Sequence, residues 1–175
     1  MWKTIALVLL IMLLLNSCST MRPEEFAQTS PEFLVEEYFQ GRTLAWGLFQ
    51  DRAGKPKRYF SVVIDGRQDG DEFVLHESFS FRDGEQSERI WRIRKLDEHT
   101  YEGRAGDVVG VAIGKRYGNA LNWKYDLLLE AGNRQWKVHF NDWMFLHDGG
   151  VLVNRAGMSK FGIRLGEVLL FFRKE

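Results

Sequence analysis

The sequence has one cysteine, three prolines and no net charge. One cysteine excludes an internal disulfide and a structural zinc site built on thiolates. Lys and Arg together number 24, as do Asp and Glu, which excludes a basic nucleic-acid binder and a highly charged disordered protein. The length of 175 residues suits one domain of ordinary size with a short appendage.

Recognisable catalytic and cofactor motifs are missing as well. The chain has no G-x-S-x-G elbow, no P-loop and no G-x-G-x-x-G, so we expect neither an enzyme nor a bound cofactor. Its four histidines are scattered without metal-ligand spacing, so we expect no metal site. The Gly-rich segment 110–114 lies in a strand pattern and is expected to mark close backbone packing or a bulge.

One apolar run is present, from Ile5 to Leu15, after a positive start at Lys3. As a helix it spans roughly 16 Å at about 1.5 Å per residue, which is too short for a bilayer core of about 30 Å. These features are typical of a secretory signal peptide, and we assign it residues 1–17. Residues 15–18, Leu-Asn-Ser-Cys, resemble the bacterial lipobox, in which the cysteine thiol receives a diacylglycerol and the chain is cut before it.

We therefore predict lipidation at Cys18 and attachment to a membrane through that lipid. The alternatives are a secreted protein cleaved nearby and an uncleaved anchor with an incidental cysteine. The next residue is Ser19 and not the Asp associated with inner-membrane retention, which favours the inner leaflet of a Gram-negative outer membrane, facing the periplasm.

The rest of the chain divides into a lipidated tether, 18–30, and a β domain, 31–175. Thr29, Pro31 and Glu32 form a helix-start pattern, and the short helix that follows is expected to end at Gly41. From there the chain alternates apolar and polar residues between Gly, Asp and Asn turns. The expected strands are 43–50, 59–65, 72–82, 87–96, 100–104, 108–117, 121–130, 135–146, 151–156 and 166–173.

This pattern predicts an all-β fold, an antiparallel up-and-down barrel of about 8–10 strands with a short N-terminal helix. A lipocalin- or calycin-like barrel fits the size, and closure removes exposed strand edges. A two-sheet sandwich would show much the same alternation, so periodicity leaves both architectures open.

Several segments resemble an uncharacterised Gram-negative lipoprotein family, domain of unknown function 3833. They include Tyr-Phe-Gln-Gly at 38–41, Gly-Asn-Ala-Leu-Asn-Trp-Lys-Tyr at 118–125 and Asn-Arg-Ala-Gly-Met-Ser-Lys-Phe-Gly at 154–162. The resemblance covers nearly all of the mature chain. It implies a periplasm-facing lipoprotein with a calycin-type barrel and no established activity.

Charged residues interrupt three apolar faces that are expected to point inward. Glu77 interrupts the face 73–81, Asp142 interrupts the face 136–144, and Arg155 ends the face 151–155. Burying an isolated charge costs several kcal/mol, so each must pair, meet water or meet a ligand. The functional hypothesis is that they orient the polar head of an amphipathic ligand. The alternative is a structural ion pair, or a bulge that turns one side chain outward.

The segment 154–166 is unusually polar for a strand and holds Arg155, Lys160 and Arg164. It is interpreted either as a polar rim that contacts an anionic head group or as a long solvated turn. Trp123 and Trp136 are candidate cavity-lining residues. Trp143 lies on the face opposite Trp136 and needs outer packing under the N-terminal helix, or a membrane or partner contact.

The function that these features favour is non-catalytic binding or carriage of a lipid-like or other hydrophobic ligand. Two alternatives remain open from the sequence. The first is a structural or assembly factor of the cell envelope with a solid barrel core. The second is a lipid-modifying enzyme, which lacks a recognisable nucleophile and base pair.

Overall fold

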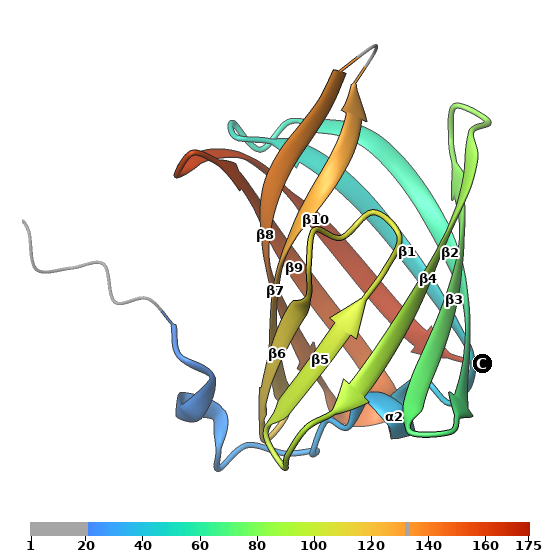
Figure 1. Ribbon diagram of the computed structural model, residues 1–175, viewed down its shortest axis with the longest axis vertical. Helices are drawn as coiled ribbons and strands as arrows, with labels where there is room; N and C mark the ends of the chain where they lie inside the picture. The colour runs from blue at the N-terminus through green and yellow to red at the C-terminus, as the bar shows by residue number, and fades with distance from the viewer. Residues whose placement is uncertain (1–20, 132–133) are drawn as a thin grey trace, which may run out of the picture.

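The computed structural model describes residues 21–131 and 134–175. Ten antiparallel strands form a closed barrel (Figure 1). Each strand pairs with its neighbours in the chain, and β1 pairs with β10, so the barrel is up-and-down. The strands are β1 Gly41–Asp51, β2 Pro56–Asp69, β3 Glu72–Phe81, β4 Gln86–Lys95, β5 Thr100–Arg104, β6 Ala112–Tyr117, β7 Ala120–Ala131, β8 Arg134–Leu146, β9 Val151–Lys160 and β10 Ile163–Lys174.

The predicted barrel is confirmed, and closure decides against the two-sheet sandwich. The predicted alternation also holds for most strands. The apolar faces of β2, β3, β7 and β8 point inward, as on β7, where Leu121, Trp123, Tyr125, Leu127 and Leu129 all face the interior. The predicted signal peptide, 1–17, and Cys18 lie outside the described residues.

One end of the barrel is closed by the short helix α2, Val35–Tyr38, and the residues around it (Figure 1). Phe33 and Phe39 are buried there, and the Phe39 ring lies 5.8 Å from the ring of Phe172 on β10. The Tyr38 hydroxyl donates to the backbone oxygen of Gly150 at 3.0 Å. Aromatic packing of this kind excludes water from the closed end.

The helix is shorter than predicted, and Thr29 does not cap it. The Thr29 hydroxyl donates to the backbone oxygen of Phe26 at 2.7 Å and accepts from the backbone N–H of Asn119 at 3.0 Å. It therefore ties the N-terminal segment to the turn between β6 and β7. The three-residue spacing from Thr29 to Glu32 is therefore not sufficient for a helix cap. Here tertiary contacts determine what the Thr29 hydroxyl binds.

A 3-10 turn, η1 Pro23–Phe26, precedes α2 and lies against the outside of the barrel. The Phe26 ring is 5.8 Å from Trp143 and 5.3 Å from Phe145. This contact explains the outward-facing Trp143: it is packed beneath the N-terminal segment, although beneath η1 and not beneath α2. A second 3-10 turn, η2 Asp148–Gly150, joins β8 to β9.

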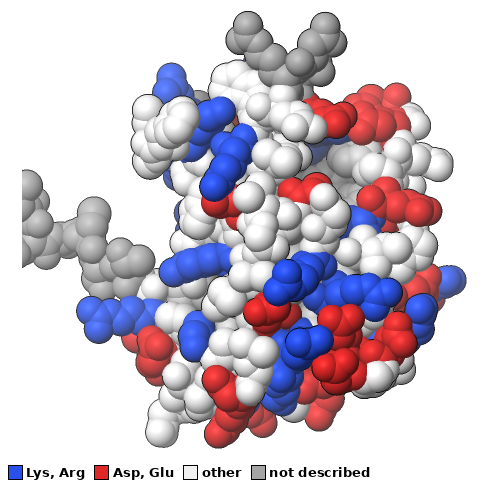
Figure 2. Space-filling model, in the orientation of Figure 1, with Lys and Arg blue, Asp and Glu red and all other residues white. Residues whose placement is uncertain are grey.

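The outer wall carries interleaved charges of both signs. Figure 2 shows blue and red side chains side by side across the lower part of the visible face. Examples are the ion pairs between β4 and β3, the β2–β3 turn and α2: Arg92–Glu72, Arg94–Asp71 and Lys95–Glu36. Exposed pairs of this kind contribute up to about 1 kcal/mol each. These paired charges give the apolar barrel a polar outer surface, and because both signs are present in equal number they leave the chain without net charge. No helix among the described residues is long and apolar enough to cross a bilayer.

Candidate ligand-binding site

The strands enclose a cavity of about 480 Å³, within the usual range of small-molecule sites. Its walls are mainly aromatic and aliphatic, with contributions from eight of the ten strands, all but β5 and β6. The residues Val35 and Phe39 form its floor at the closed end. At the other end the lining reaches Arg58 and Phe81, which are partly exposed and form the mouth. Much of the aromatic lining is contributed by Phe60, Phe79, Trp91, Trp123, Phe140 and Phe172.

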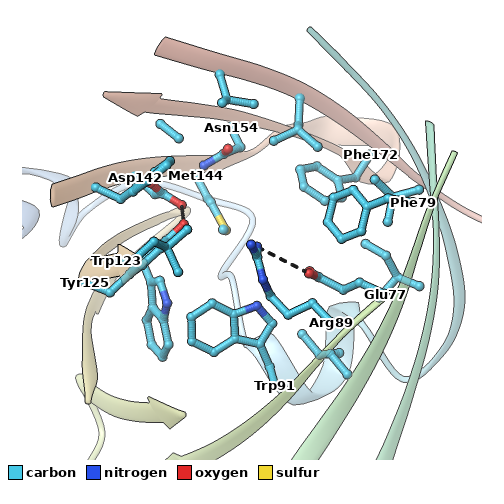
Figure 3. A pocket seen from close by; sticks show the side chains of 18 of the residues that line it. Glu77, Phe79, Arg89, Trp91, Trp123, Tyr125, Asp142, Met144, Asn154 and Phe172 are labelled. Atoms are coloured by element: carbon cyan, nitrogen blue, oxygen red, sulfur yellow. Dashed lines mark hydrogen bonds and ion pairs between the residues drawn. The ribbon is translucent and has the colours of Figure 1, made fainter. Parts of the chain in front are cut away.

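Two carboxyl groups and one guanidinium lie among these apolar walls (Figure 3). Glu77 comes from the middle of β3 and Asp142 from β8, and both line the cavity as predicted. Arg89 comes from β4, directly opposite Glu77 in the strand pairing. Figure 3 shows its guanidinium projecting into the space between the two carboxyl groups.

Arg89 is held mainly by a third carboxylate, that of Asp107. Its Nη2 lies 2.6 Å and its Nε 3.0 Å from Oδ2 of Asp107, whereas its Nη1 lies 3.9 Å from Oε2 of Glu77. Asp107 reaches Arg89 from the loop 105–111, which fills the wall above the short strands β5 and β6. Two close N–H···O⁻ contacts to one carboxylate are the strong form of this ion pair, so the charge of Arg89 is largely compensated.

Asp142 is the most deeply buried of the three carboxylates. Its residue is 5% exposed, and its Oδ2 accepts a hydrogen bond from the Tyr125 hydroxyl at 3.0 Å. Burial raises the pKa of Asp142 to about 7, although the Tyr125 hydrogen bond and the charge of Arg89 oppose the rise. Burial and the Asp142 charge in turn raise the pKa of Tyr125. The phenol therefore remains a hydrogen-bond donor near neutral pH.

Glu77 lies in a similar environment. Burial raises the pKa of Glu77 to about 7, and the positive charge of Arg89 offsets part of that effect. The negative charge of Asp107 also raises the pKa of Glu77, because it disfavours a second negative charge nearby. Burial thus moves the pKa values of both cavity carboxyls toward neutral pH, where a charge placed beside them would change their protonation states.

Arg155 does not enter the cavity, so the prediction that it faces inward is wrong. Its side chain is 64% exposed and donates to Glu167 on the outer wall at 2.8 Å, beside a second cation, Arg164. The inward residues of β9 are instead Leu152, Asn154, Ala156 and Met158. Apolar residues occur at both alternating positions of this strand, so its phase could not be read from the pattern alone.

The segment 154–166 is a hairpin at the mouth end of the barrel and not a long turn. It forms the end of β9 and the start of β10, joined by a two-residue hairpin loop. Lys160 and Trp136 are at the mouth end of the barrel, outside the cavity lining. The Lys160 ammonium lies 3.9 Å from the centre of the Trp136 ring, which is 41% exposed. These two predicted ligand-binding residues therefore contact each other and do not line the cavity.

Sequence reasoning missed Arg89 and Asn154, and it gave no polar role to Tyr125. Arg89 shares its strand face with Trp91 and Ile93, which is the same interruption of an apolar face that identified Glu77. Asn154 was missed because the phase of β9 was misread. No group of three or more His, Cys, Asp or Glu suited to a metal ion occurs among the described residues.

Comparison with known proteins places the chain. The family model "Protein of unknown function (DUF3833)" matches residues 12–174. The chain belongs to this family. No curated protein matches it. A similar solved structure is the S-type phycobiliprotein lyase CPES from Guillardia theta, with 11% identity and a TM-score of 0.58 over 89% of this chain and 98% of that one. That likeness confirms the lipocalin-like barrel and concerns the fold alone.

Proposed function

We propose that this DUF3833 protein binds or carries a lipid-like or otherwise hydrophobic molecule inside its barrel, without chemically changing it. The observation that carries the proposal is the cavity of about 480 Å³, walled by aromatic and aliphatic side chains and furnished with a few buried polar groups. Sites for apolar small molecules have this composition. A solid barrel core, as the assembly-factor alternative requires, would leave no such space.

The polar groups of the lining favour binding over catalysis. Among the described lining residues they are the side chains of Arg58, Glu77, Arg89, Asp142, Asn154, Tyr125 and the two tryptophans. Such groups orient a ligand by hydrogen bonds, and none is paired with a serine, cysteine or histidine nucleophile within the lining. The lyase shares only the fold, so its activity is not transferred to this chain.

The test is native mass spectrometry of the protein purified without its signal peptide and anchor. Every contact described above lies within residues 21–175, so a chain that begins at Ser19 and is exported behind a cleavable signal peptide keeps them all. We expect a hydrophobic molecule to co-purify and to be recovered chemically unchanged. Recovery of a product together with its precursor would instead support the enzyme alternative.

A cavity-filling variant sharpens this test. Ala156 is buried and lines the cavity, so Ala156→Phe directs a ring into the ligand space. We expect this variant to fold and to lose the bound molecule. Val63 lies on the outer face of β2, and Val63→Phe adds the same ring without touching the cavity. Equal ligand content in both variants would contradict the proposal.

We further propose that the barrel is tethered through acylated Cys18 to the inner leaflet of the outer membrane and faces the periplasm. The lipobox-like residues 15–18 support this. The path of η1 along the outer wall is compatible with it, because η1 packs against β6 and β7 and does not cover the mouth of the cavity. Metabolic labelling with a palmitate analogue followed by membrane fractionation tests it. The label and the membrane association should both be lost in Cys18→Ser.

A further inference from the structure

Two buried carboxylate oxygens in the cavity have no hydrogen-bond partner among the described residues. They are Oδ1 of Asp142 and Oε2 of Glu77, both beneath the molecular surface; Nη1 of Arg89 lies 3.9 Å from the latter, beyond hydrogen-bond distance. A buried acceptor without a donor costs about 1 to 3 kcal/mol, and more when it is charged. The fold keeps two such acceptors facing one space, and each would be satisfied by a donor placed in that space.

The charge of the site points to the kind of donor. Glu77, Asp107 and Asp142 supply three carboxylates against the single guanidinium of Arg89, which Asp107 already holds at close range. The other cation of the lining, Arg58 at the mouth, is paired with Asp83 and Glu85. No uncompensated cation therefore lines the described cavity, and an anionic head group would meet net negative charge wherever Glu77 or Asp142 is ionised.

We propose that the ligand of this cavity is an amphipathic molecule whose polar end is a protonated amine, received by Glu77 and Asp142. This proposal rests on the proposed binding function and specifies the ligand class. The ammonium supplies donors to the two unpartnered oxygens and compensates the excess negative charge. Its apolar part lies against the aromatic walls. The site thus selects against the anionic head group that Arg155 and Lys160 were expected to bind.

The ligands for a direct test are dodecylammonium, dodecanol and dodecanoate, which share one chain and differ in the polar end. Each is titrated below its micelle concentration into the chain that begins at Ser19, at a pH near 8, and binding is followed by tryptophan fluorescence or calorimetry. We expect dodecylammonium to bind at least about tenfold more tightly than dodecanoate, with dodecanol between them, as a charge-assisted hydrogen bond worth roughly 1.4 kcal/mol or more requires.

Substitution of both acceptors identifies their role. In the double variant Glu77→Gln, Asp142→Asn we expect the preference for dodecylammonium to disappear while dodecanol binding is retained. Asp126→Asn is the matched control, because Asp126 directly follows Tyr125 on β7 but faces outward toward Lys137 and His139. This control should keep the full preference.

The pH dependence of the unaltered protein provides a readout that needs no variant. Glu77 and Asp142 face Arg89, Tyr125 and Asp107, and both carboxyls have a pKa raised to about 7 by burial. Their ionised fraction increases between pH 6 and pH 8, whereas a primary amine with a pKa near 10 stays protonated. Dodecylammonium affinity should therefore rise severalfold over this interval, while dodecanol affinity changes little.

The outcomes separate the two proposals. Equal affinity for the three ligands would show that apolar contact alone drives binding, which overturns the amine proposal and leaves the binding function standing. Preference for dodecanoate or dodecanol, or amine affinity that does not rise with pH, would also overturn it. Failure of all three to bind, with no hydrophobic molecule co-purifying, would instead count against the binding function itself.

Discussion

The Tyr125 hydroxyl donates to one oxygen of Asp142 at 3.0 Å, while the other oxygen of the same carboxyl is buried in the cavity without a partner. The phenol fixes the orientation of the carboxyl and leaves one acceptor for a ligand. Asp142 is therefore positioned by the barrel wall and only partly satisfied by it. A carboxyl with one oxygen held by the protein and the other free to accept a hydrogen bond is typical of a binding group and not of a structural ion pair.

The variant Tyr125→Phe tests the hydrogen bond from the Tyr125 hydroxyl to Asp142. Without the donor, the pKa of Asp142 should rise further above its ordinary value, because that hydrogen bond opposes the effect of burial. We also expect a loss of about 1 to 3 kcal/mol in the free energy of unfolding at a pH near 8, where a buried ionised oxygen would lose its donor. Carboxyl chemical shifts give the pKa and urea unfolding gives the stability. Tyr59→Phe on the outer wall should change neither.

The stability of the unliganded protein should fall as pH rises from about 4 to above 7. Glu77 and Asp142 have folded-state pKa values of about 7, above the ordinary values of 4.5 and 3.8, so the folded protein binds more protons than the unfolded chain across this window. The stabilising effect is complete below the unfolded pKa values and is lost as pH passes the folded ones. The total is on the order of a few kcal/mol.

Urea unfolding between pH 5 and pH 8 measures this loss of stability. The surface carboxylates titrate below this pH range and do not contribute to it. The double variant Glu77→Gln, Asp142→Asn should show a nearly flat profile, because neither amide titrates. Asp126→Asn should keep the wild-type slope, since its carboxylate lies on the outer wall with a lowered pKa. A flat wild-type profile would show that neither carboxyl is forced to change its charge on folding.

The strands and most of their inward faces could be predicted from the sequence because nearly every strand alternates in one phase and ends at a Gly, Asp or Asn turn. Glu77 and Asp142 could be predicted for the same reason, since a charge on a regular apolar face is visible in the pattern. Closure could not, because the pairing of β1 with β10 joins the two ends of the domain and leaves no local mark in either strand.

The remaining errors have two physical origins. Arg155 was misplaced because β9 carries apolar residues in both phases, so the choice rests on its pairing with β8 and β10. Asp107 was not identified because it belongs to a loop, whose side chains follow no period. Backbone hydrogen bonds to β7, such as that from the Val109 N–H to the Asp126 oxygen at 2.9 Å, hold the loop in place. In that position the Asp107 carboxylate contacts Arg89 on β4.

Asp107→Asn should release Arg89 toward Glu77. The pKa of Glu77 should fall, because a negative charge that raises it is removed while Arg89 remains beside it. The loop 105–111 should also exchange its amide hydrogens faster, since its closest tie to β4 is the pair of contacts to Arg89. Hydrogen exchange and carboxyl shifts measure the two effects. Asp65→Asn removes an exposed ion pair to Arg42 on the outer wall and should affect neither.

Gly114 is predicted to tolerate no side chain. A Cβ at this position would lie 2.2 Å from Cε3 and 2.3 Å from Cζ3 of the buried Trp123 ring. Close packing within the segment 110–114 is therefore found at Gly114, whereas a Cβ at Gly110 would meet nothing within 4 Å. Gly114→Ala must therefore displace the indole or the strand, at a cost of roughly 1 to 3 kcal/mol. The near-ultraviolet circular dichroism of the cavity tryptophans should change with it. Gly157→Ala is the control, because its Cβ would meet only one atom at 3.7 Å.

Phe161 occupies a backbone conformation that glycine or asparagine adopts at lower energy. It is the only non-glycine residue with positive φ in the described chain, at 50°, and with Gly162 at 77° it forms the tip of the β9–β10 hairpin. Two positive φ values in a two-residue loop are the pattern in which Asn-Gly is favoured. The Phe161 ring is 92% exposed, so its removal costs little packing. Phe161→Asn should therefore raise the free energy of unfolding by about 0.5 to 1 kcal/mol. Phe161→Ala keeps a Cβ without the local hydrogen bonding of asparagine and should give no such gain, so equal stabilisation by both would locate the benefit in the loss of the ring and not in the backbone.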